Sequence, residues 1–374
     1  MRLGVASNRE RRAGRPAAVR WRTPSTPSPR RTSVVTQALA ELKEDNMKPW
    51  MVALVLTLAV GSWPPPVADS QAARVYKIGQ LAVPSREAMT PLVQAVEDGL
   101  RDLGYVKGQN LVIEYRFADG KPERLPGLAA ELARLNVDVI VTGVTELGLA
   151  AKRATTTVPI VVFAASDVVA SGLVASVHRP GGNVTGLTSD IDPVIFARNV
   201  ELLKEVVPGL SRAAILGDPS YPGTAPYWRA TEDAARHLGV ALRPIEVRKA
   251  DELRPAFATM TRDRVDAVIV FANLVTFAAR KEIAALALQN RVPALYMATW
   301  AVDAGGLLAY GLNVTERARR SATYIDKILK GANPAELPME SPPRYDLMIN
   351  LKAAKALGLT IPQSLLHRAD KVIE

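Results

Sequence analysis

From residue 76 onward, short apolar runs rich in Val and Ile alternate with longer segments in which apolar residues recur at helical spacing. The short runs are typical of strands that are buried on both faces, as in parallel sheets. The longer segments are typical of helices with one apolar face. In the first half of the chain, the pattern predicts strands at 76–83, 111–117, 137–142 and 160–164, and helices at 91–103, 122–135 and 146–155.

A turn-forming sequence, RPGGN at 179–183, interrupts this alternation. A short strand is expected directly after it, at 184–189, and the alternation then resumes. The second half of the chain predicts strands at 212–216, 241–247, 267–271, 294–297 and 307–310, and helices at 194–206, 227–238, 251–262, 276–290 and 315–330. The chain therefore contains two similar units, which the pattern alone divides once, near Gly182.

Strands that alternate with helices predict an α/β fold, in which helices cover both faces of a parallel sheet through right-handed crossovers. Open α/β sheets bind ligands at the carboxyl ends of their strands. Two such units in tandem therefore predict two lobes with a ligand cleft between them.

Residues 47–73 have a different pattern. Met47 and Lys48 precede an uncharged apolar run at 51–63, which is followed by a Pro-rich turn and the small-residue sequence SQAA at 70–73. This order is typical of a secretory signal peptide. The run is too short for an ordinary transmembrane helix, which needs roughly twenty residues. A buried core helix is the alternative, but the run has no polar face.

The net charge of +10 raises the possibility of nucleic-acid binding, so its location matters. Residues 1–46 hold ten Lys and Arg against four acids, which is +6 of the total and leaves +4 for the rest. This Arg-, Ser- and Pro-rich leader precedes a signal peptide that should begin a chain, so we hypothesise that translation starts at Met47. A basic nucleic-acid arm is the alternative, but no helix-turn-helix periodicity supports it, and we expect no nucleic-acid partner.

The chain has no cysteine, which excludes disulfides, thiolate metal sites, cysteine nucleophiles and a lipid-modified N-terminal cysteine. The exported protein is therefore expected free in the periplasm rather than as a lipoprotein. The three histidines, His178, His237 and His367, are widely spaced and show no metal-ligand pattern. The glycine pairs at 181–182 and 305–306 show neither a phosphate loop nor a dinucleotide fingerprint. No metal, cofactor or catalytic residue is expected.

Five stretches resemble one family in their order and spacing: GLRDLGYVKGQNLVIEY at 99–115, RPGGNVTGLT at 179–188, AGGLLAYG at 304–311, YIDKILKG at 324–331 and INLKAAKALGLTIP at 349–362. Together they are similar to the type I periplasmic substrate-binding proteins of ABC transporters, in the tryptophan-binding-protein-like subfamily. The resemblance covers about residues 76–374.

This resemblance implies two Rossmann-like lobes joined by three crossings. The N-terminal lobe would contain 76–187 and 312–374, and the C-terminal lobe 188–311. It also implies a monomer that captures a small polar ligand, an amino acid or a similar molecule, by closure of the lobes. The partner would be an ABC transporter permease in the inner membrane, which accepts the ligand.

Four candidate ligand contacts, at three positions, follow strands of the first unit: Ser85, Arg86, Thr145 and Asp167. Thr145 lies between the strand expected at 137–142 and a helix, as does a ligand-contacting Thr or Ser in the family that the chain resembles. Free backbone NH groups at a helix start favour a carboxylate there, although Thr145 could equally be a helix cap. Ser85 and Arg86 follow the first strand, where Arg86 could pair with an acidic ligand or be an ordinary surface residue.

Asp167 follows the strand expected at 160–164 and matches an Asp that lines the cleft in the family. In the family a Pro usually follows this Asp, whereas Val168 stands here, so a looser loop is expected. The Asp167 carboxylate could pair with the ammonium group of an amino acid. A solvated helix cap is the alternative.

In the second unit, Asp218, Tyr221, Asn273 and Trp300 lie just beyond the ends of predicted strands and are expected to face the cleft. Trp300 could stack on a planar or apolar part of the ligand, or instead be a hinge or core residue. Trp228 is expected to pack its own helix.

Two other function classes remain open. A sensory ligand-binding module of the same fold would need a DNA-binding helix pair or a tether, which 1–46 does not supply. A periplasmic α/β enzyme would need a nucleophile, a base and an orienting group in one cleft, and no such trio is evident.

Overall fold

A computed structural model describes residues 74–189, 194–218, 224–341 and 344–374. The expected basic leader at 1–46, the expected signal peptide at 47–73 and Tyr221 lie outside these residues. Within the described part of the chain, no helix is both long and apolar enough to cross a membrane.

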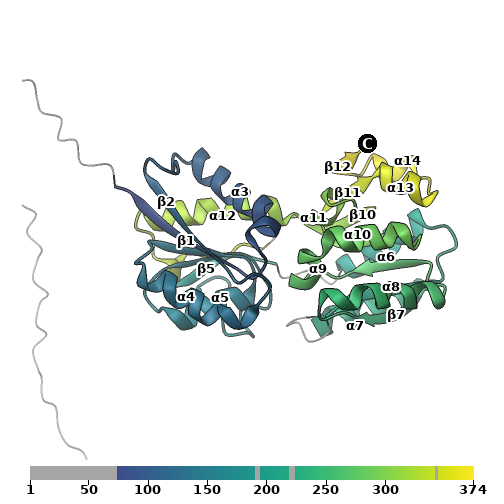
Figure 1. Cartoon of the computed structure of the whole chain (residues 1–374), viewed down its shortest axis with the longest axis horizontal. Coiled ribbons are helices and arrows are strands. Elements are labelled where there is room, and N and C mark those ends of the chain that lie inside the picture. Colours follow the sequence, from purple (N-terminus) through teal and green to yellow (C-terminus); the bar gives the residue numbers. More distant parts are fainter. Residues whose placement is uncertain (1–73, 190–193, 219–223, 342–343) are drawn as a thin grey trace, which may run out of the picture. The chain divides into compact units, whose positions relative to one another are not determined.

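The first lobe is built on five parallel strands in the order β2-β1-β3-β4-β5. Strands β1, β2 and β5 of this sheet are seen in Figure 1. They are β1 (Tyr76–Ala82), β2 (Leu111–Phe117), β3 (Val139–Thr142), β4 (Ile160–Ala165) and β5 (Val184–Thr188). Helices α4 (Leu125–Arg134) and α5 (Thr145–Ala154) cover one face, and α3 (Arg86–Asp102) and α12 (Val314–Leu329) cover the other. Strand β3 is buried along its whole length, which explains its largely apolar composition.

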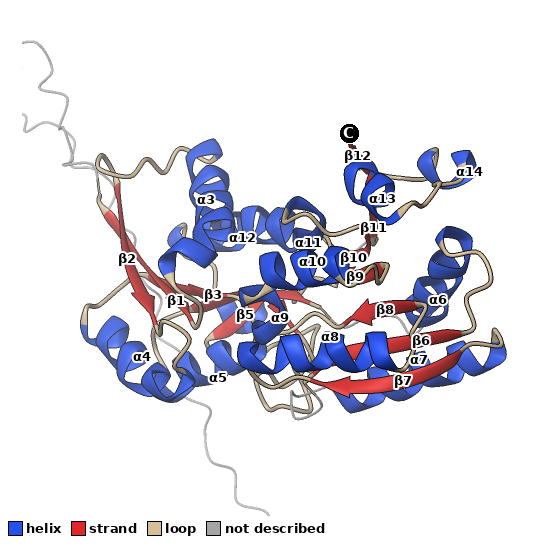
Figure 2. Ribbon diagram, turned by 45° about the vertical axis from the view of Figure 1, so that its right-hand side comes forward, coloured by secondary structure: helices blue, strands red, loops and turns tan. Residues whose placement is uncertain are grey.

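The second lobe is built on seven strands in the order β12-β11-β10-β9-β8-β6-β7 (Figure 2). They are β6 (Arg212–Gly217), β7 (Ala241–Glu246), β8 (Ala267–Val270), β9 (Ala294–Ala298), β10 (Leu308–Leu312), β11 (Asp346–Asn350) and β12 (Lys371–Ile373). One face packs against α6 (Val194–Val206), α7 (Thr224–His237), α13 (Leu351–Leu357) and α14 (Gln363–Leu366). The other packs against α8 (Leu253–Arg262), α9 (Leu274–Ala278), α10 (Arg280–Gln289) and α11 (Trp300–Asp303). Two lobes of this kind confirm the expected α/β fold class.

The C-terminal segment corrects the expected division of the lobes. Helix α12 packs on α3 and β4 of the first lobe, but β11 then pairs antiparallel with β10, with Leu308 opposite Ile349. Strand β12 extends the same sheet beside β11. The assignment of the whole segment 312–374 to the N-terminal lobe is therefore wrong for 346–373. The apolar side chains of β11 are buried against the second sheet, and this burial favours their pairing with β10.

Helix α3 starts earlier than the sequence pattern predicts. It begins at Arg86 rather than at Pro91, because the Ser85 hydroxyl oxygen accepts a hydrogen bond from the Ala88 backbone NH and caps the helix. Ser85, a predicted ligand contact, therefore has a structural role at this helix start.

Helices α3 and α12 approach each other closely at Gly99. A Cβ atom at this position would lie 2.9 Å from the Ala322 Cβ and closer still to the Arg319 carbonyl oxygen. Only glycine leaves room for the α12 backbone there, so the position of α12 on the first lobe depends on it.

We expect Gly99→Ala to lower the free energy of unfolding by about 1–3 kcal/mol, because the helices must shift apart to admit a methyl group. Gly127→Ala in α4 is the matched control, since no heavy atom lies within 4 Å of the place that its added Cβ would occupy. That control should be neutral, or stabilising by up to about 1 kcal/mol through higher helix propensity. Urea unfolding measures both changes, and equal midpoints for the two variants would contradict the close contact.

Candidate ligand-binding site

A pocket lies where strands of both sheets end. From the first lobe it is lined by residues that end or follow strands, including Pro84 after β1, Gly143 after β3 and Ser166 after β4. From the second lobe, Asn273 follows β8 and Ala298 ends β9. The carboxyl ends of parallel strands are the usual ligand position in open α/β sheets. The cavity volume of about 130 Å³ has room for on the order of ten water molecules, which suits a small molecule.

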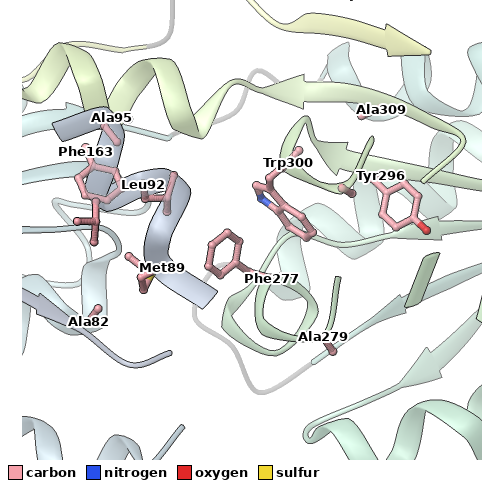
Figure 3. Packing of buried hydrophobic residues seen from close by; sticks show 14 of the residues in the cluster. Ala82, Met89, Leu92, Ala95, Phe163, Phe277, Ala279, Tyr296, Trp300 and Ala309 are labelled. Atoms are coloured by element: carbon pink, nitrogen blue, oxygen red, sulfur yellow. The ribbon is translucent and has the colours of Figure 1, made fainter. Parts of the chain in front are cut away.

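The pocket wall is mostly apolar and rich in aromatic rings. Its aromatic side chains are Phe163 from the first lobe and Tyr227, Phe271, Phe277 and Trp300 from the second. Phe277 and Trp300 meet edge to face, with ring centroids 5.4 Å apart and planes at 90°. Figure 3 shows this pair opposite Met89 and Leu92 of α3, which also line the pocket. Such walls bury flat apolar groups with a defined orientation.

Asn273 brings an uncommitted polar group to this apolar wall. Its side-chain oxygen Oδ1 accepts a hydrogen bond from the Thr276 backbone NH at 2.9 Å, and the Thr276 hydroxyl accepts one from the Asn273 NH at 3.0 Å. This reciprocal pair caps α9 and fixes the direction of the amide. The Asn273 side chain is buried, and its Nδ2 has no hydrogen-bond partner among the described residues. A buried unpaired NH₂ group is costly, so it favours an acceptor on a bound ligand.

Positive charge lies behind the pocket wall. The Arg317 Nε of α12 donates to the Phe163 carbonyl oxygen at 3.1 Å, and its Nη2 donates to the Thr188 carbonyl oxygen. Burial lowers the pKa of the Arg317 guanidinium to about 10. The group therefore remains charged at neutral pH, close to one wall residue of the pocket.

Two of the predicted contacts, Asn273 and Trp300, line the pocket. Thr145 is buried and begins α5, but its Oγ1 donates to the Ser166 carbonyl oxygen at 2.6 Å and accepts from the Ser166 NH at 3.0 Å. The hydroxyl thus joins α5 to the loop after β4, and Val144 is the cap residue. Arg86 is exposed, with its guanidinium 4.8 Å from the Tyr115 ring centroid.

The predicted acidic contacts lie elsewhere. Asp167 is exposed and has a left-handed φ of 52°, a conformation that a residue with a short polar side chain tolerates. The next residue, Val168, is buried in the core under α5. Asp218 is half-buried at the end of β6. Neither Asp167 nor Asp218 lines this pocket, and neither do Ser85, Arg86 and Thr145.

The sequence reasoning missed most of the wall. Met89 and Leu92 belong to a helix face that has the pattern of ordinary core, and Phe163 lies inside a buried strand. Phe271 directly follows β8, and Phe277 lies within α9. A residue such as Phe271 could have been found from its position in the sequence, because a large apolar residue at the carboxyl end of a parallel strand faces the cleft edge of the sheet.

No group of three His, Asp or Glu side chains within the described residues could hold a metal ion. The pocket itself is lined by apolar side chains together with backbone, serine and asparagine groups. Its arrangement is suited to holding a small molecule through shape and a few directed hydrogen bonds.

Comparison with known proteins gives the family. The family model for ABC transporter substrate binding proteins matches residues 77–373. A tyrosine-binding protein of Clostridioides difficile (strain R20291) is 23% identical over 260 residues, which cover 70% of this chain and 74% of that protein.

Two solved structures share the fold and more than a quarter of the aligned sequence. A conserved domain protein from Vibrio cholerae is 28% identical with a TM-score of 0.72, covering 80% of this chain and 100% of that one. An ABC domain from Streptococcus pneumoniae in complex with L-Trp is 26% identical with a TM-score of 0.72 and the same coverage. The resemblance seen in the sequence is confirmed. The chain belongs to the ABC transporter substrate-binding proteins, a family that binds solutes and is not a family of enzymes.

Proposed function

We propose that this protein captures a small amino acid with an aromatic or other flat apolar side chain and delivers it to the permease of an ABC transporter. The observation that carries the proposal is the pocket wall, in which four aromatic rings of the second lobe line the same pocket as the unpaired amide NH₂ group of Asn273. The apolar wall suits the side chain of such a ligand, and the amide suits its carboxylate.

The aromatic wall discriminates by shape. Phe277 and Trp300 present an edge and a face at right angles, and Tyr227 stacks on Phe271 at 6.0 Å. A planar ring can fill such a space with offset or edge contacts, whereas a charged side chain would be desolvated there without a partner. The tyrosine-binding relative and the L-Trp complex support this class of ligand.

The amino-acid backbone of the ligand has a matching environment. The Asn273 Nδ2 could donate to a carboxylate oxygen, and the guanidinium of Arg317 adds positive charge behind the wall. We place the protein in the periplasm as a monomer whose lobes close on the ligand, so that the permease recognises the closed form. The expected signal peptide at 47–73 supports export.

Thermal unfolding with a panel of ligands tests the ligand class. A ligand at 100 times its Kd stabilises the protein by about 2.7 kcal/mol, which raises Tm by several degrees at roughly 2–4 °C per kcal/mol. We expect such a rise with L-tyrosine or L-tryptophan and none with L-lysine or L-glutamate. Stabilisation by the charged amino acids alone would refute the proposed ligand class.

Asn273→Asp tests the amide donor. The carboxylate keeps the oxygen that caps α9 but replaces the NH₂ donor with an acceptor that repels the ligand carboxylate. We expect the Kd measured by calorimetry to rise by roughly tenfold to a hundredfold, the range of a hydrogen bond to a charged group.

Asn350→Asp is its matched control. Asn350 is a buried cap in the same lobe, whose side-chain oxygen accepts from the Ala353 NH at 3.1 Å, and it does not line the pocket. This control should bind ligand like the wild type. Equal affinity in the Asn273→Asp variant would remove Asn273 from the site.

Trp300→Phe and Trp228→Phe form a second matched pair. Both tryptophans are buried in the second lobe, but only Trp300 lines the pocket. The change in tryptophan emission on adding L-tyrosine should be largely lost in Trp300→Phe and kept in Trp228→Phe. An emission change that survives Trp300→Phe and disappears in Trp228→Phe would contradict the assigned wall.

A further inference from the structure

Arg280 is a buried cation at the edge of the pocket wall. It begins α10 and is 9% exposed. Its Nη1 donates to the Phe277 carbonyl oxygen at 2.8 Å, and its guanidinium carbon lies 4.5 Å from the centroid of the Phe277 ring. The side chain therefore holds Phe277 both by its backbone and by its ring face.

The same guanidinium reaches the other lobe. Its Nη2 donates to the Ala88 carbonyl oxygen at 2.9 Å. Ala88 lies in the first turn of α3, where the Ser85 hydroxyl caps its NH, and the next residue, Met89, lines the pocket. One side chain thus joins the aromatic wall of the second lobe to the helix that forms the opposite wall.

The guanidinium of Arg280 is held by carbonyl oxygens and a ring face rather than by a carboxylate. Within the described residues no carboxylate forms an ion pair with it, and burial lowers the pKa of its guanidinium. Its partners are two carbonyl oxygens and one ring face. The planar guanidinium therefore fixes two hydrogen bonds at a set angle to each other, which positions the groups that accept them. A lysine has the charge but lacks two donors fixed in one plane, and methionine has neither.

We propose that Arg280 is a positioning residue of the ligand site, which sets the angle of Phe277 against Trp300 and joins that pair to the start of α3. Closing the lobes and ordering the aromatic wall are then a single event. The inference rests on the proposed solute-binding function, because it assigns a role at the same pocket.

The first test measures the lobes without any ligand. The chain has no cysteine, so Arg134→Cys on α4 and Ala258→Cys on α8 place two spin labels at exposed positions, one in each lobe. Without ligand, we expect this labelled parent to sample both an open and a closed arrangement of the lobes. Arg280→Met should reduce the share of the shorter, closed distance and lengthen the mean, and Arg280→Lys should give an intermediate result.

Arg254→Met is the matched control. Arg254 is an exposed arginine of the same lobe, which pairs with Glu282 at 3.5 Å and makes no described contact with the first lobe. Its distance distribution should equal that of the parent. If Arg280→Met does not fold, the distance distribution of Arg280→Lys decides whether Arg280 has the proposed role. A distribution unchanged from the parent in the folded Arg280 variants would overturn the proposal.

The second test uses L-tryptophan and L-tyrosine as probes on the full chain. Arg280→Met should raise the dissociation rate on the order of tenfold, with the association rate nearly unchanged and Tm close to that of Arg254→Met. A wild-type protein that binds neither probe would refute the aromatic ligand class, while the label distances would still decide the role of Arg280. Probe dissociation at the wild-type rate in both Arg280 variants would also count against it.

Discussion

The return of α12 to the first lobe is the constraint on which the cleft depends. The chain leaves the second sheet at Leu312, and α12 must then bury its apolar face against α3 and β4. Gly99 permits the close approach of the helix backbones, and Arg317 ties the helix to the ends of β4 and β5 through two carbonyl oxygens. Without this return, Val314 would not lie beside the strand ends that form the pocket.

The connections between the lobes meet near the same helix. The Thr188 NH donates to the Glu340 carbonyl oxygen at 2.9 Å, and Arg320 of α12 forms an ion pair with Glu340 at 2.5 Å. Hydrogen bonds and an ion pair therefore join the end of β5, α12 and the segment at Glu340 beside the points where the chain passes from one sheet to the other. One hydrophobic cluster lies in the second lobe and another lies almost wholly in the first. The largest cluster contains residues of both lobes, among them Met89 of α3 and Phe277 of α9, so apolar contacts also join the lobes.

The sequence predicted the fold class well because buried parallel strands leave a strong apolar signal. The placement of 346–373 in the N-terminal lobe came from the family resemblance and was wrong. The pattern alone, divided once near Gly182, keeps this segment with the second sheet that β11 joins, but it misses the return of α12 to the first lobe. The site was harder still. Asn273 and Trp300 could be found from their places after strands, whereas Arg280 acquires its role only through a contact with Ala88, 192 positions away in the sequence. Such contacts depend on the packed lobes and leave no local pattern.

The rings of the pocket are divided unequally, with Phe163 from the first lobe and four others from the second. A ligand would therefore meet most of its recognition surface on the second lobe before the first lobe covers it. The selection of the ligand and the time for which it stays bound would then depend on different residues. Substitutions in the ring wall would alter which solute is first selected. Substitutions in α3 would alter how long that solute is retained.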